Sequence, residues 1–148
     1  MTPPGDMHAD SQASILYYLK LAALEGLGKV RGDVGVILSR DPDTVVGPDA
    51  AFILTASLPL KISPEGYLET IPDIVVEIRS KNDSMPEVED KVADYLAAGV
   101  KLVWVIDSAK DSIYAYEPTG RTILKRGDVL TTSLLPTFRV PVEKLLEE

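Results

Sequence analysis

Apolar residues recur at three- and four-residue intervals in two segments, and this spacing predicts two helices. The first helix is expected over residues 9–27, with glycines at its end as a stop signal. The second is expected from Ser84 to about residue 98. It opens with a capping box in which Ser84 is followed three positions later by Glu87.

Strands are predicted where apolar residues alternate with polar ones or form short continuous runs. The predicted strands are residues 29–38, 45–54, 71–78, 100–107, 112–117 and 122–127, and a last strand with a helical tail within 137–148. The strand–helix–strand unit over residues 72–106 predicts a right-handed parallel crossover, and the short turns between the early strands predict antiparallel pairs. The expected fold class is α/β with mixed α+β character: one domain, residues 1–148, with a mixed central sheet flanked by helices.

Composition narrows the classes of protein that fit this pattern. Hydrophobic residues make up 45% of the 148 residues and no apolar run approaches the roughly 20 residues that span a bilayer. There is no cysteine, and the first ten residues lack the order of a secretory signal, so we expect a soluble, cytoplasmic protein without membrane association. The net charge of −8 argues against a non-specific nucleic-acid coat but not against a nuclease with acidic active-site residues.

One carboxylate interrupts the apolar run "IPDIVVEIRS", residues 71–80. Burying Glu77 there is costly unless it is paired, protonated or bound to a cation. Asp49 lies 28 residues earlier, at a Gly-Pro kink in the preceding predicted strand. If the two strands are neighbours, the two carboxylates could converge and hold Mg²⁺. The alternatives are a turn role for Asp49 and a buried salt bridge between Glu77 and an arginine.

Three segments in order, "VVGPDAAFI", "IPDIVVEIRSKNDS" and "KVADYLAAGVKLVWVID", together with the N-terminal "PPGDMHADSQASILYYL", resemble the Uma-type family of restriction-endonuclease-like proteins. This family is a branch of the PD-(D/E)XK nuclease superfamily. The resemblance covers about residues 3 to 146 and implies a restriction-endonuclease-like core. It further implies that Asp49 and Glu77 are catalytic ligands of Mg²⁺ or Mn²⁺, and that the substrate is DNA.

The chain departs from the superfamily motif at the lysine that follows the second acidic residue. Arg79 stands two residues after Glu77, where the superfamily usually has lysine. Arginine can contact a phosphate but cannot act as a general base, because it stays protonated. Members of the family often carry the lysine on the following helix, which implies that Lys91 acts with Arg79 in catalysis. The alternative for Lys91 is a surface ion pair with Glu87 four residues before it.

The resemblance bears on other residues as well. Family members commonly begin with a further acidic segment, so we expect one early acidic residue near the metal to be missing. His8, the only histidine, is expected either at the surface or capping a helix, or lining the site as a substrate contact. Ser80 is expected to shape the turn after the active strand and to contact substrate. Tyr95 and Trp104 are expected in the core, and Asp107 in a turn.

The sequence therefore predicts a metal-dependent endonuclease that cuts DNA and acts as a homodimer, since cutting two strands calls for two sites. The main alternative is a binding or regulatory module that keeps the fold with a degenerate site. A third possibility is an enzyme of the same fold acting on RNA.

Overall fold

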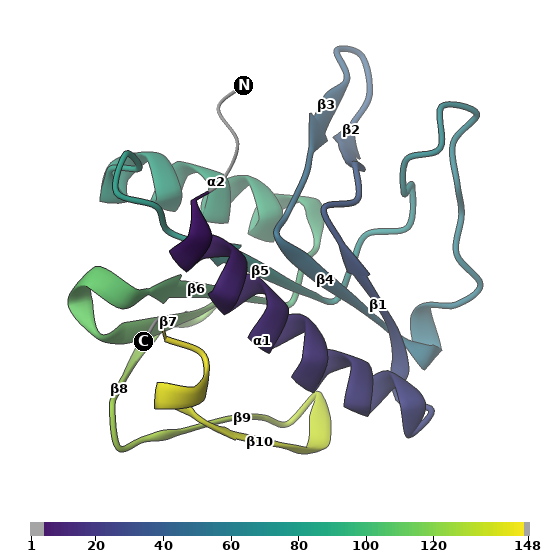
Figure 1. Cartoon of the computed structure of the whole chain (residues 1–148). Coiled ribbons are helices and arrows are strands. Elements are labelled where there is room, and N and C mark those ends of the chain that lie inside the picture. Colours follow the sequence, from purple (N-terminus) through teal and green to yellow (C-terminus); the bar gives the residue numbers. More distant parts are fainter. Residues whose placement is uncertain (1–4, 147–148) are drawn as a thin grey trace.

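The structure is a computed structural model that describes residues 5–146 (Figure 1). Its centre is a six-stranded sheet in the order β1-β4-β5-β6-β7-β8. These strands are β1 (Gly28–Gly32), β4 (Ala50–Leu54), β5 (Ile74–Ile78), β6 (Leu102–Asp107), β7 (Ser112–Glu117) and β8 (Gly120–Lys125). β5 and β6 are parallel and every other neighbouring pair in this sheet is antiparallel, which confirms the predicted mixed sheet and parallel crossover.

Two helices cover opposite faces of the sheet (Figure 1). On one face, α1 (Asp6–Leu24) packs Ile15 and Leu19 against the side of β5 that carries Val76. On the other face, α2 (Met85–Ala98) packs against the side that carries Val75. Ser84 caps α2 by accepting a hydrogen bond from the Glu87 amide, as the capping box predicts.

A small antiparallel pair, β9 (Val129–Thr132) and β10 (Leu135–Pro141), completes the α1 face. Phe138 of β10 stacks on Trp104 of β6 with ring centroids 5.1 Å apart, which confirms Trp104 as a core residue. The chain then forms a 3-10 turn, η3 (Val142–Lys144), within the predicted helical tail; residues 147 and 148 of that tail lie outside the described residues.

Two predicted strands are each divided in the structure. The segment 29–38 splits into β1 and β2 (Val36–Ser39), and 45–54 splits into β3 (Thr44–Val46) and β4. β2 and β3 form a separate hairpin. The first break occurs because Asp33 adopts a left-handed backbone conformation, with φ of 52°, and because Gly35 lets the ring of Tyr67 lie against the backbone. The second break coincides with the Gly-Pro kink that places Asp49 at the start of β4.

Two further 3-10 turns, η1 (Thr55–Ser57) and η2 (Ser108–Lys110), follow β4 and β6. Within residues 5–146, no helix is both long and apolar enough to cross a membrane.

Candidate active site

Asp49 and Glu77 lie opposite each other on neighbouring antiparallel strands. Ala50 of β4 pairs with Val76 of β5, so the residue before Ala50 lies across from the residue after Val76. Asp49 Oδ2 also accepts a hydrogen bond of 2.7 Å from the backbone amide of Ile78. The register therefore brings the two carboxylates together, as the sequence suggested for neighbouring strands.

Both carboxyl groups are largely removed from water, and Asp49 disfavours ionisation of Glu77. Glu77 is 9% exposed and the Asp49 side chain 14%. Burial, followed by repulsion from Asp49, raises the pKa of Glu77 to about 7. Burial also raises the pKa of Asp49, although the Ile78 amide and His8 oppose the effect. At neutral pH the pair is strained electrostatically and would be relieved by a bound cation.

The helix α2 delivers two side chains to Glu77 from one face. The Tyr95 hydroxyl donates a 2.5 Å hydrogen bond to Glu77 Oε1. Burial and the neighbouring Glu77 raise the pKa of Tyr95, so the phenol stays protonated and remains a donor. Lys91, one turn earlier, lies near enough for its charge to lower the pKa of Glu77.

Two of the alternatives left by the sequence can be compared with the contacts of Lys91 and Glu77. The Glu87 carboxylate accepts a hydrogen bond from Ser84 Oγ at 3.0 Å, and no ion pair within 4.0 Å joins it to Lys91, both being described residues. Glu77 takes its hydrogen bond from a tyrosine and has no arginine partner within that distance among residues 5–146. Neither the surface pair for Lys91 nor the buried salt bridge for Glu77 is observed.

The first turns of α1 hold Asp49 from the other side. His8 Nε2 lies 3.1 Å from Asp49 Oδ1, with both side chains 14% exposed. Gln12, one turn later, donates 3.0 Å hydrogen bonds to the Asp49 carbonyl and to Asp33 Oδ1. Of the two expectations for His8, the structure places it beside the site; the N-cap of α1 is Gly5.

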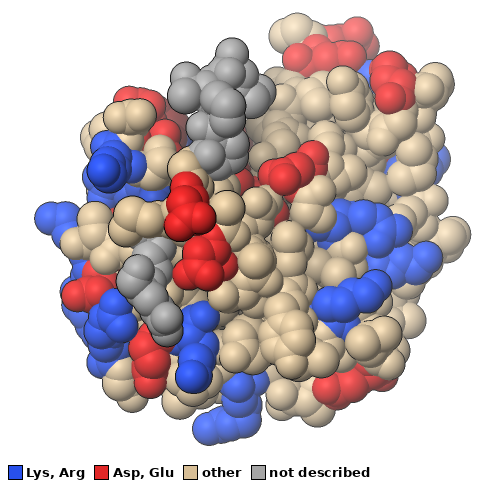
Figure 2. Space-filling model, viewed as in Figure 1, with Lys and Arg blue, Asp and Glu red and all other residues tan. Residues whose placement is uncertain are grey.

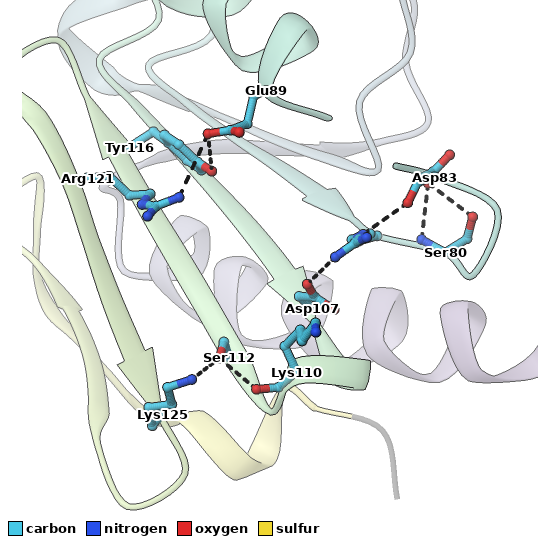
Figure 3. A network of polar contacts seen from close by, with 10 residues as sticks. Ser80, Asp83, Glu89, Asp107, Lys110, Ser112, Tyr116, Arg121 and Lys125 are labelled. Atoms are coloured by element: carbon cyan, nitrogen blue, oxygen red, sulfur yellow. Dashed lines mark hydrogen bonds and ion pairs between the residues drawn. The ribbon is translucent and has the colours of Figure 1, made fainter. Parts of the chain in front are cut away.

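Arg79 does not join this cluster. Its Nη1 donates a 2.8 Å bond to Asp107, whose side chain is 1% exposed, and its Nε donates to the Asp83 carbonyl. Ser80 binds the Asp83 carboxylate through both its amide and its hydroxyl (Figure 3). Asp107, expected in a turn, is instead the buried last residue of β6 and anchors Arg79. Arg79 and Ser80 thus order the loop after β5.

The chemistry of the Asp49–Glu77 pair can be compared with what a divalent metal requires. Two buried carboxylates with raised pKa values offer hard oxygen ligands and a local excess of negative charge. Within residues 5–146 no group of three or more His, Cys, Asp or Glu side chains is arranged to hold a metal ion. Mg²⁺ commonly keeps several waters and uses one or two protein carboxylates, so two carboxylates agree in number with such a site.

Comparisons with known proteins identify the family and the fold of the chain. The model of the family Uma2, described as "Putative restriction endonuclease", matches residues 1–143. The chain belongs to the Uma2 family. A "putative nuclease belonging to DUF820" from Anabaena variabilis, solved by crystallography, has the same fold: the TM-score is 0.81 at 16% sequence identity, over 97% of this chain and 82% of that chain. A search of curated proteins finds no match.

For this Uma2 member, the structure adds two residues that the sequence did not single out for the site. Tyr95 was expected in the core, and it is buried there, but its hydroxyl reaches Glu77. Gln12 contacts the backbone of Asp49. Spacing along the sequence could have indicated both residues. Tyr95 lies four residues after Lys91 and Gln12 four residues after His8, and this spacing puts each pair on one helix face.

Proposed function

We propose that the protein is a metal-dependent endonuclease that hydrolyses phosphodiester bonds of DNA. The observation that carries the proposal is the convergence of Asp49 and Glu77 beside Lys91 at one edge of the sheet. Membership of a family of restriction-endonuclease-like proteins makes nucleic acid the expected substrate. Hydrolysis of a phosphodiester requires stabilisation of negative charge on phosphate and a positioned water, and this cluster can supply both.

Asp49 and Glu77 would hold Mg²⁺ or Mn²⁺, which supplies Lewis-acid stabilisation of the phosphate and lowers the pKa of a bound water. Lys91 places a positive charge next to the carboxylates and would stabilise the phosphate or orient the attacking water. Tyr95 orients the Glu77 carboxylate, and Gln12 holds the backbone of Asp49 through its carbonyl. His8 lies beside Asp49 and lines the approach for substrate.

Arg79 enters the proposal in a changed role. Two of its donors are committed to Asp107 and to the loop carbonyl of Asp83, so we assign it to holding the end of β5 in place. The positive charge expected from the lysine of the superfamily motif then falls to Lys91 alone. The competing hypothesis is a binding module that keeps the fold with a degenerate catalytic site. Such a module requires only the fold.

Calorimetry with Mn²⁺ tests the metal site. Wild type is expected to bind Mn²⁺, and Asp49→Asn and Glu77→Gln should each abolish the binding heat. Asp90→Asn, which changes an exposed carboxylate of α2, serves as the matched control and should bind as wild type does. Absence of Mn²⁺ and Mg²⁺ binding to wild type would reject the nuclease and favour the binding module.

Cleavage assays test the reaction and the substrate. Supercoiled plasmid should be nicked or linearised with Mg²⁺, and Lys91→Met should lower the rate on the order of 10²-fold while leaving Mn²⁺ binding in place. Cleavage of RNA but not DNA would correct the substrate class. Light scattering at the assay concentration checks the proposed homodimer.

A further inference from the structure

A cleft of about 790 Å³ lies between the first turn of α1 and the loops that follow β5 and β6. These loops leave the carboxyl ends of two parallel strands, which is where open α/β sheets usually bind ligands. The residues of the cleft used in the argument below are His8, Arg79, Lys81, Lys110 and Arg126.

The cleft adjoins the proposed active site through His8, although neither Asp49 nor Glu77 lines it. His8 lines the cleft and its Nε2 lies 3.1 Å from Asp49 Oδ1. Arg79, also in the wall, follows Glu77 by two residues. A nucleic-acid strand lying in this cleft would therefore pass beside His8, which contacts Asp49.

The charge of the cleft differs from that of the whole molecule. It is lined by four of the chain's 15 Lys and Arg residues but by three of its 23 Asp and Glu residues. On the face shown in Figure 2, basic side chains form small groups separated by acidic and uncharged residues, with no broad positive surface among the described residues. A local positive excess in an otherwise acidic protein, with net charge −8, concentrates attraction for phosphate in one place.

The cationic side chains of the cleft are not equally free to bind a phosphate group. Arg79 is bound to buried Asp107. Arg126 pairs with Asp111 at 2.9 Å, but both side chains are about half exposed, so that pair is weak and a phosphate can replace the aspartate. Lys81 and Lys110 are exposed, and neither has a carboxylate partner within 4.0 Å among residues 5–146.

We propose that this cleft binds the sugar-phosphate backbone of the nucleic acid next to the bond to be cut, with Lys81, Lys110 and Arg126 as phosphate contacts. The inference rests on the proposed nuclease function and names the path that its substrate takes. No Phe, Tyr or Trp side chain lines the cleft in the described part of the chain, so it lacks the large stacking surfaces used to hold single-stranded bases. The backbone of duplex DNA is the expected occupant.

Binding and cleavage are measured separately to test this path. Fluorescence anisotropy in EDTA reports binding of a labelled DNA duplex of about 20 base pairs at several salt concentrations. The double variant Lys81→Glu/Lys110→Glu should bind at least tenfold more weakly. The slope of log K against log salt should become shallower by about 2, because each phosphate contact contributes about 0.9. The control, Lys20→Glu/Lys61→Glu, makes the same change of charge at exposed positions outside the cleft.

The outcomes separate the cleft from the chemistry. If wild type cuts DNA and the two double variants bind equally well with the same salt slope, the cleft inference is overturned and the nuclease stands. If wild type binds duplex through Lys81 and Lys110 but never cleaves with any metal, the cleft stands and the nuclease fails. Tighter binding of single strands or RNA than of duplex, lost in the same variant, would overturn the assignment of duplex DNA.

Discussion

Asp73 and Glu77 lie four residues apart, at the two ends of the same buried strand segment, and both are largely removed from water. Asp73 is surrounded by donors: the Leu54 amide at 2.8 Å, the Ser57 hydroxyl at 3.0 Å and Lys101 Nζ at 3.1 Å. Glu77 has one donor, Tyr95, and a second carboxylate, Asp49, beside it. The same kind of side chain is therefore compensated at one end of β5 and left with an excess of negative charge at the other.

The number of donors and cations around a buried carboxylate separates structural carboxylates from candidate functional ones better than burial does. Asp107 belongs with Asp73, because the Arg79 guanidinium neutralises it within the protein. The pair of Asp49 and Glu77 is the exception, because within residues 5–146 neither carboxylate has a lysine or arginine within 4.0 Å, and only His8 lies that close to Asp49. A fold that keeps such a pair is less stable for it, which is expected of a site that binds a charged ligand.

The largest effect on stability is expected from removing a cation that neutralises a buried carboxylate. Arg79→Ala would leave Asp107 buried and unpaired, and should lower the free energy of unfolding by about 4 kcal/mol. Urea denaturation measures it, with Arg139→Ala as a control at an exposed arginine of β10, where little change is expected.

A second variant tells stability apart from substrate binding at this position. Arg79→Ala/Asp107→Ala removes the unpaired charge and should recover part of the lost stability. If Arg79→Ala instead unfolds like wild type but loses DNA binding, Arg79 contacts phosphate, as the sequence resemblance implies.

Much of the fold could be predicted from the sequence because its signals are local. The capping box of α2 and the continuous apolar run of β6 each specify an element by themselves. The division of segment 29–38 into two strands could not be predicted, because it depends on the ring of Tyr67 packing on Gly35, a contact between residues 32 positions apart.

The candidate site was predictable only in part, for the same reason. Glu77 is conspicuous in an apolar strand, and strand order then places Asp49 opposite it. The partner of Arg79 depends on the side chain at the end of the next parallel strand, Asp107, which a pattern along the chain does not reveal. Tyr95 appears as one more apolar position on α2 until its hydroxyl is placed.

Removing a buried carboxylate that is surrounded by donors should have the next largest effect on stability. Asp73→Ala would leave the Leu54 amide without an acceptor and remove the bonds to Ser57 and Lys101. We expect a loss of about 3 kcal/mol in the free energy of unfolding, with the exposed Lys101 contributing little. Asp90→Ala on the exposed side of α2 is the control. An unchanged unfolding midpoint in Asp73→Ala would show that these contacts are not what keeps Asp73 buried.

The smallest effect, and the one of opposite sign, is expected at Glu77. Its pKa is raised from 4.5 to about 7 in the folded protein, so its protonated form is the one the fold favours. The stability that this group contributes is fully present below about pH 4.5 and is lost as pH rises through about 7. At pH 8 ionisation costs at most about 3 kcal/mol. Glu77→Gln should therefore stabilise the metal-free protein by about 2 kcal/mol, because the bond from Tyr95 is weaker to an amide than to a carboxylate.

Unfolding in EDTA at pH 5 and at pH 8 measures this pH dependence directly. The difference in stability between Glu77→Gln and wild type should be small at pH 5 and reach its full size at pH 8, whereas Asp73→Ala should be destabilised at both. Adding Mn²⁺ at pH 8 should reverse the order of wild type and Glu77→Gln, because the ion binds the ionised carboxylate and not the amide. If Glu77→Gln is destabilised at pH 8 without metal, the protein stabilises ionised Glu77 as it does Asp73. The contrast between the two ends of β5 then does not mark a metal site.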